Sequence, residues 1–582
     1  MLQDCPPVRS CPARATRRLR RAITFSVLLV LAVAAEIGGT PADAQESDEG
    51  SASRPESGAP GAPFAVPTTP DSAFAVELAG IEGVPLSVEE AVGAALSYDT
   101  DVREAEAGLA AARGTVKREK GTFDPTLFAT TLWSEQDLPT ASFFAGADVL
   151  EESQTFTTGG ARIKLWTGTE LAAALESRRF ATNSTFAFLV PERSMSGLLS
   201  LRQPVLKGFG PSAHEELSAA ERLLDAALAR YDDAVLSSRA RTEQTYWDLY
   251  AAIRDLAVQR RIRSGADGFL TQARLRAQGG LVGPNEVANA RVFLADQEEA
   301  LLDREENADL ISDQLASLMG RRPAGAPRYR TTDEPARDFP VVDADLLVTQ
   351  AVERNLELKA AGEEVDAIRA LARGAAWDAL PRLDLIGSIG GNGLAGDPHP
   401  VVFDSTLFLT DVHGDFGDAW DQVSDRKFPT WSAGFAVEIP IPFREGRGER
   451  DRLRAEVARA EQRQIATRLS LEEDVRASHR ELAHAMRRLE VAQDGAEASY
   501  EQVRIGQLEY TAGRTTAFEL VRLGADLAEA QQRYSQALVR TAKAAAELRR
   551  LTSGAYPDIA DDQSGNEDSP GGAGDLPESE DR

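Results

Sequence analysis

The sequence predicts a mainly α-helical protein that also carries a set of membrane-type β-strands, built from two similar halves. Three observations lead to this prediction. The chain contains an internal repeat, it contains helical patterns too long for a globular domain, and between them lie segments that alternate apolar and polar residues.

The N-terminal 44 residues have the pattern of a secretory signal peptide. Five arginines in residues 14–21 precede an apolar run at 22–35, and Ala42 and Ala44 form a small-x-small cleavage site. The apolar run is shorter than the roughly 20 residues of a spanning helix. We therefore expect cleavage after Ala44 and export of the mature chain, with a retained membrane anchor as the alternative.

Composition narrows the class of protein further. Cys5 and Cys11 are the only cysteines and lie in the expected signal peptide, so the mature chain would form no disulfide. Cleavage removes six basic and three acidic residues, which changes the net charge from −28 to −31. So acidic a chain is a poor partner for nucleic acid. Residues 45–80 and 553–582 are rich in Ser, Pro, Gly, Ala and acidic residues, and we expect a disordered linker and a disordered acidic tail.

The part between these flanks repeats itself. Residues 99–127 match residues 355–383 without a gap, at an offset of 256. Residues 277–301 match residues 510–534 at an offset of 233. The match is one of pattern, and the fall in offset places extra residues in the first half.

The repeats are assigned to residues 81–340 and 341–552, and each is expected to contain a short helix, a long helix and a returning helix. Ser87 and Glu90 have the spacing of a capping box at the first helix start. No proline interrupts 211–278, a helix that would be about 100 Å long at 1.5 Å per residue. The shorter helices have about half this length, which predicts antiparallel coiled-coil packing with two short helices beside each long one. The predicted helices are 86–121, 211–278, 284–319, 343–378, 448–511 and 515–552.

Strand patterns occur at about 126–206 and about 382–442. In "FAVEIPI" (435–441) every second residue is large and apolar, and "ARIKLW" (161–166) and "LDLIGSI" (383–389) alternate similarly. Period two predicts strands with one apolar and one polar face. In an exported protein such strands suit a membrane barrel, and a small soluble sheet is the alternative. The extra residues of the first repeat predict four strands there against two in the second, with the added hairpin beside the usual pair.

A barrel of this kind needs more than one chain. No stretch after the signal peptide is long and apolar enough for a spanning helix. One chain offers only four to six strands, and an open sheet edge cannot lie in lipid, because its peptide groups would lack hydrogen-bond partners. The barrel would have to close by association of several copies, most simply with cyclic symmetry.

Together these features resemble the TolC-like family of outer-membrane efflux and secretion channels. The resemblance covers about 81–552 and rests on "QPVLKGFG" (203–210), "EIPIPFREGRGERDRLRAEVARAEQ" (438–462), "GGLVGPNEVANAR" (279–291) and "YTAGRTTAFELVRL" (510–523). It implies a homotrimer whose β-barrel, completed by trimerisation, lies in outer-membrane lipid, with a helical tunnel crossing the periplasm. It also implies a passive duct for efflux or type I secretion, supplied by an inner-membrane transporter and a periplasmic adaptor.

The resemblance gives a role to two interruptions of the helical pattern, at 279–284 and 511–515. Each would be the reversal at the tunnel tip, where glycine permits a tight turn and Pro284 suits the first turn of the returning helix. It further implies that the adaptor docks at these tips. The docking residues are then Gly280, Leu281 and Val282 on the first tip and Gly513 on the second.

A periplasmic gate is implied beside the tips. The family's gate tyrosine and its acidic partner correspond to Tyr510 and Glu286, and its constriction acids to Glu519 and Arg522. Arg514 lies next to the position of a tip arginine. Arg522 departs from the family, because a ring of guanidinium groups would pair with the Glu519 carboxylates and make the mouth less anionic. An ordinary surface pair at i, i+3 is the alternative.

Catalytic patterns are not found in the sequence. The five histidines are scattered, and no Gly-Lys phosphate loop or cysteine nucleophile follows the signal peptide. The acidic segment 399–418 is compatible with a calcium site and with a solvated external loop. We expect no enzyme, cofactor or metal. The alternative to a channel is an exported coiled-coil scaffold without a pore.

Overall fold

The structure is a computed structural model that describes residues 77–403, 405–512 and 514–557. The expected signal peptide, nearly all of the expected linker and most of the expected acidic tail lie outside these residues. Within the described ranges, none of the helices combines the length and the hydropathy that a bilayer-spanning helix needs.

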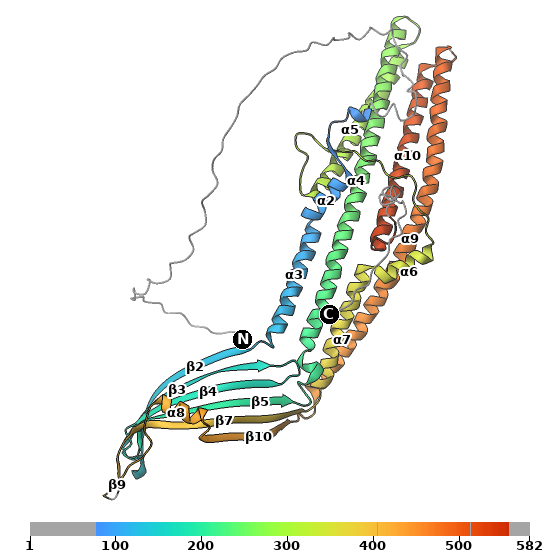
Figure 1. Cartoon of the computed structure of the whole chain (residues 1–582). Helices are drawn as coiled ribbons and strands as arrows, with labels where there is room; N and C mark the ends of the chain where they lie inside the picture. Colours follow the sequence, from blue (N-terminus) through green and yellow to red (C-terminus); the bar gives the residue numbers. More distant parts are fainter. Residues whose placement is uncertain (1–76, 404, 513, 558–582) are drawn as a thin grey trace, which may run out of the picture. The chain divides into compact units, whose positions relative to one another are not determined.

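Two long helices, one per repeat, organise the helical part (Figure 1). They are α4 (Glu215–Gln278) and α9 (Arg444–Thr511). Helices α3, α5, α7 and α10 all pack along α4, and α7 and α10 also pack along α9. The bounds of these four are α3 Thr100–Gly121, α5 Pro284–Met319, α7 Leu356–Asp378 and α10 Ala517–Leu551.

The first helix of each repeat differs from the prediction, because each is broken into two. Helix α2 (Val88–Tyr98) is separated from α3 by Asp99, and α6 (Ala344–Arg354) is separated from α7 by Asn355. The two residues have nearly equal backbone angles, near φ −58° and ψ 128°, and each side chain accepts a hydrogen bond from the first turn of the following helix. Such residues favour helix N-caps over helix interiors, which explains the breaks. They are related by the repeat offset of 256.

The largest apolar core surrounds the middle of α4. Tyr246 is fully buried there, and its hydroxyl donates to the carbonyl of Leu86 at 2.9 Å. Leu86 ends the short strand β1 (Val84–Leu86), which pairs in parallel with β6 (Tyr329–Thr331). Burial raises the pKa of Tyr246 to about 12. This core links the N-terminal segment of the first repeat to α4 and α10.

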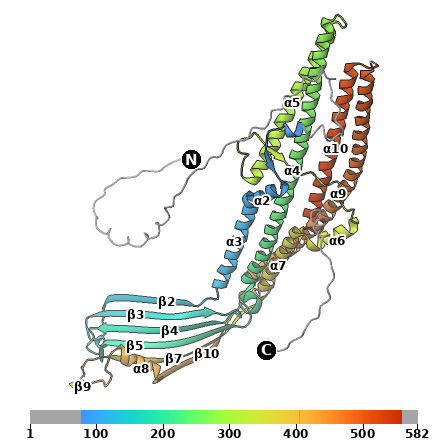
Figure 2. The ribbon, with the colours of Figure 1, turned by 45° about the horizontal axis from the view of Figure 1, so that its top comes forward.

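Six of the remaining strands form one antiparallel sheet, in the order β10-β7-β5-β4-β3-β2 (Figure 2), and β8 (Val401–Phe403) pairs with β9 (Thr406–Phe408) in a separate antiparallel pair. Four strands come from the first repeat and two from the second, the division that the sequence predicts. Strands β2 and β10 lie at its two edges. The bounds are β2 Thr126–Pro139, β3 Val149–Lys164, β4 Glu170–Thr182, β5 Leu189–Pro204, β7 Arg382–Pro398 and β10 Phe428–Glu438.

Candidate channel wall and helical tips

The two faces of the sheet differ in chemistry. Apart from an irregularity between Leu189 and Glu192, the strands pair odd-numbered with odd-numbered residues, so each face carries residues of one parity. The odd-numbered face, called the apolar face below, bears more of the large exposed apolar side chains. Charged and hydroxyl side chains are commoner on the even-numbered face, called the polar face, where Leu132, Ile386 and Phe428 are also exposed. Exposed members of the apolar face are Leu127, Trp133, Leu199, Leu201, Leu385, Ile389, Trp431, Phe435 and Val437.

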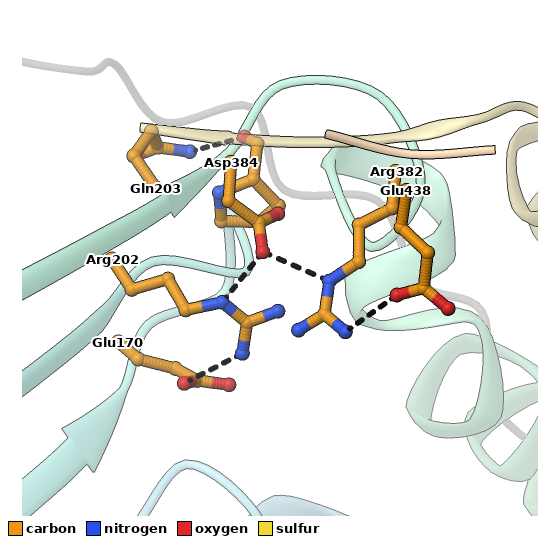
Figure 3. A network of polar contacts seen from close by, with 7 residues as sticks. Glu170, Arg202, Gln203, Arg382, Asp384 and Glu438 are labelled. Atoms are coloured by element: carbon orange, nitrogen blue, oxygen red, sulfur yellow. Dashed lines mark hydrogen bonds and ion pairs between the residues drawn. The ribbon is translucent and has the colours of Figure 1, made fainter. Parts of the chain in front are cut away.

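A row of ion pairs crosses the polar face at the end of the sheet nearest the helices (Figure 3). At its centre Asp384 is 2% exposed and accepts hydrogen bonds from Nε of Arg202 at 2.8 Å and Nε of Arg382 at 2.9 Å. Arg202 continues to Glu170 at 3.0 Å, and Arg382 continues to Glu438 at 3.5 Å. The row therefore joins β4, β5, β7 and β10. A buried carboxylate is costly unless it is paired, and the two arginines meet this need.

The apolar face also carries a short helix, α8 (Phe416–Ser424), which begins inside the segment 399–418 predicted as a loop. It lies over β5 and β7 where the strands have glycines: a Cβ at Gly197 would come within 3.0 Å of Val423, and one at Gly393 would collide with the Ala419 carbonyl. Asp415 and Asp418 form its capping box. That Asp-x-x-Asp spacing was the available sequence signal.

Residues 399–418 raised the alternative of a calcium site. The Asp415 carboxylate accepts from the backbone N–H groups of Gly417 and Asp418. In the ranges that the structure describes, no group of three or more His, Cys, Asp or Glu side chains is arranged to hold a metal ion.

The first tip is built by a helix C-cap with two characteristic hydrogen bonds. Gly280 has φ of +72°, its N–H donates to Ala277 at 3.0 Å, and the N–H of Leu281 donates to Arg276 at 2.9 Å. This is a Schellman motif, in which the left-handed position favours glycine. Leu281 is 78% exposed, Val282 is half-buried, and α5 starts at Pro284. The turn leaves an apolar side chain projecting at the end of the hairpin.

The second tip, at the end of α9, shares one of these hydrogen bonds. Arg514 donates its N–H to the carbonyl of Glu509 at 2.8 Å, the counterpart of the bond between Leu281 and Arg276. Gly513, the expected docking residue, lies outside the described residues. Thr516 then caps α10, and its hydroxyl accepts from the N–H of Glu519 at 3.2 Å.

The resemblance implies that Tyr510 bonds to Glu286 on a neighbouring hairpin. Within one copy, the structure gives Tyr510 another partner. The Tyr510 hydroxyl accepts a hydrogen bond from the amide of Gln272 on α4, while Glu286 is half-buried in the first turn of α5. Arg514 and Arg522 are exposed. In this described part of the chain, no ion pair joins Glu519 to Arg522. Gln272 was missed, because sequence spacing within one helix does not reveal its neighbour.

An apolar cluster ties the two tips together. Phe269 of α4 packs against Phe518 of α10 with ring centroids 5.8 Å apart, and Val521 is buried with Ala290 nearby. The two helical hairpins of one chain therefore contact each other close to their turns, beside the expected gate.

The carboxyl group of Glu215, at the start of α4, is a half-buried titratable group outside the tips. The Glu215 side chain packs against Gly374 of α7, where any added side chain would collide with the carboxylate. Burial, and then the charges of Asp378, Glu216 and Glu449, raise the pKa of Glu215 to about 7. No gate role was expected for this residue.

Comparison with known families decides the assignment. The model of the outer membrane efflux protein family matches residues 91–321 and 347–554, one range in each repeat and together most of the chain. This chain belongs to the outer membrane efflux protein family. Membership confirms the resemblance seen in the sequence and places this efflux protein in the outer membrane, with its helices in the periplasm.

Solved structures of the same kind share the fold. The outer-membrane channel OprN aligns with a TM-score of 0.57 at 17% identity, covering 81% of this chain and 90% of its own. The CmeC outer membrane channel of Campylobacter jejuni gives 0.56 at 15% identity, covering 82% and 88%. The outer membrane protein VceC of Vibrio cholerae gives 0.55 at 14% identity, covering 81% and 97%. A search of curated proteins by sequence finds no match.

Proposed function

We propose that three copies of this efflux protein form an outer-membrane channel that passively conducts substrates. An inner-membrane transporter would supply the energy, and a periplasmic adaptor would connect the two. The observation that carries the proposal is the six-stranded sheet, with its exposed apolar face and two unpaired edges. In lipid such edges leave peptide groups without partners, so the sheet must close with other copies.

The strand count supports a wide, water-filled barrel. Three copies of six strands give 18 strands, and barrels of about 16–18 strands leave an aqueous channel in place of a packed interior. The apolar face would meet lipid, and the polar face with its ion-pair row would line the lumen. The narrowest point of the path is then expected at the helical tips.

The tips would serve docking and gating. Leu281 projects from the first turn with Gly280 and Val282 beside it, which suits contact with an apolar site on the adaptor. Gly513 is the counterpart on the second tip.

The gate is proposed at the same end, around Glu286, Tyr510, Arg514, Glu519 and Arg522. Glu519 and Arg522 lie one turn apart near the start of α10. In a trimer, three carboxylates and three guanidinium groups would then surround the axis. Such rings pair with each other, so we expect weaker cation selectivity than a purely acidic mouth would give.

The proposal can be tested on protein purified from outer membranes. Its mass in detergent should be three times that of one chain, and liposomes that contain it should leak a small hydrophilic solute. A folded single copy, or a trimer that leaves liposomes sealed, would contradict the proposal and favour a scaffold without a pore.

A further inference from the structure

We propose that, in the assembled protein, β10 of one copy pairs with β2 of the next so that Glu438 lies opposite Thr126. Glu438 then binds Arg162 of the next copy, and the ion-pair row extends across each seam between copies. The inference rests on the proposed function, because it requires copies that close into one barrel. It adds the register of the seam and the residues that fix it.

Charge at the two edges of the sheet points to this contact. At the β10 edge, Glu438 binds Arg382, but its side chain remains 72% exposed. On β3, next to the other edge, Nε of Arg162 donates to the hydroxyl of Thr126 at 3.2 Å, which holds the guanidinium over β2. Among the residues that the structure describes, no carboxylate pairs with Arg162. One edge thus ends in an anion and the other in a cation, at the same end of the sheet.

The tilt of the strands gives an independent argument for the register. Within one copy, the cross-strand partners followed from Thr126 on β2 lead to Ser432 on β10. Glu438 lies six residues further along β10 than Ser432, toward the helices. Pairing Glu438 with Thr126 of the next copy therefore shifts the strands by about 20 Å over six strand spacings of about 29 Å, a tilt of about 35°. Membrane barrels have tilts of roughly 35–45°. The line from Thr126 to Ser432 runs perpendicular to the strands through Arg162, Ala172, Ser200 and Ser388.

The directions of the peptide groups agree with this pairing. Thr140 donates its N–H to Asp148 just beyond the β2–β3 ladder, so even-numbered residues of β2 direct their peptide groups toward β3. Val205 donates to the carbonyl of Leu383, so odd-numbered residues of β7 face β5 and even-numbered ones face β10. Glu438 and its proposed partner are therefore both at non-hydrogen-bonded positions of the seam, where Cα atoms come within about 4.5 Å.

Cysteine cross-linking in native outer membranes tests the register, since no cysteine follows Cys11 in the chain. The double variant Glu438→Cys with Thr126→Cys should give disulfide-linked dimers and trimers under mild oxidation. The matched controls are shifted by two residues on the same face: Ala436→Cys with Thr126→Cys, and Glu438→Cys with Phe128→Cys. We expect about tenfold less product from either control.

The outcomes separate the register from the proposed function. Stronger cross-linking of a shifted pair, or no cross-linking of any pair in protein that is still trimeric, would overturn the register and leave the channel intact. Protein that is monomeric before any substitution would overturn both.

A double-mutant cycle tests the ion pair itself. Glu438→Gln and Arg162→Gln should each lower the temperature at which the trimer dissociates in sodium dodecyl sulfate, because each removes one charge of the same pair. The dissociation temperature of the combined variant should be no lower than that of the less stable single variant, because the first substitution already breaks the pair and the second has nothing further to break. Additive losses would contradict the pair. Glu438→Gln combined with Arg178→Gln, a residue further along the same face, is the control that should be additive.

Discussion

At the scale of the residue, Asp384 is central to the row of ion pairs. It is buried between Arg202 and Arg382, which are only partly exposed. Asp384→Asn should lower the free energy of unfolding by about 1–3 kcal/mol, because two guanidinium groups lose a charged acceptor. Asp397→Asn is the control, since Asp397 is 59% exposed in its pair with Arg193 and solvent-exposed ion pairs add little to stability. Urea unfolding in detergent measures both, and equal losses would contradict the assignment.

Glu215 gives a pH dependence of stability. Its pKa rises from an ordinary 4.5 to about 7 in the folded chain, so the folded state holds a proton that the unfolded state has lost. Below about pH 4.5 the carboxyl is protonated in both states and costs no stability. As the pH rises from about 4.5 to about 7, only the unfolded state loses the proton, so the free energy of unfolding should fall across that window. Glu215→Gln should flatten the fall. Melting temperatures from pH 4.5 to 8 measure this effect, and a variant with an unchanged slope would argue against Glu215 as its source.

At the scale of the element, the first tip depends on one left-handed residue. Gly280→Ala should cost about 1 kcal/mol locally, because φ of +72° is unfavourable for a residue with a Cβ. The amide of Leu281 should then exchange with solvent roughly five times faster. Gly283→Ala is a matched control, since Gly283 has φ of −84° and open space around its Cα. Equal acceleration in both variants would show that the Schellman turn does not hold the tip.

Some features of the helices and strands could be predicted from the sequence, and others could not. Helical periodicity and proline spacing located the long helices, because α4 and α9 are coiled-coil elements whose pattern is local. The breaks at Asp99 and Asn355 escaped notice, since a short polar residue in a helical pattern is ambiguous until its side chain is seen to cap. Alternation identified the two faces of the strands. It could not give their order, because hydrogen-bonded neighbours such as Leu201 and Gly387 are far apart in the chain.

The helix reversals at the tips are encoded locally in the sequence, whereas the contacts around them within one copy are not. Glycine and proline spacing is a local signal, so the reversal after Gln278 could be found. The partner of Tyr510 could not, because Gln272 lies in the other repeat and comes near it only where α10 packs against both α4 and α9. The Gly280 turn and the Gln272 contact both lie at the end of the helical hairpins of one copy.

At the scale of the whole molecule, the proposed duct has two distinct parts. A barrel of 18 strands would be wide and polar inside, whereas the helical hairpins converge near Phe269 and Phe518. Conductance should therefore be set by residues at the tips and respond little to substitutions on the polar face of the sheet. Arg522, exposed near the start of α10, is the residue whose charge should affect ion selectivity most.

Single-channel conductance in planar bilayers tests the central claim, that copies of this chain close into a conducting tunnel with its constriction at the tips. Wild-type protein should form long-lived pores, and Arg522→Asp should increase cation selectivity and sensitivity to polyvalent cations, because it replaces three cations by three anions at the mouth. Unchanged selectivity would exclude Arg522 from the constriction. Well-folded protein from outer membranes that never conducts would contradict the channel itself.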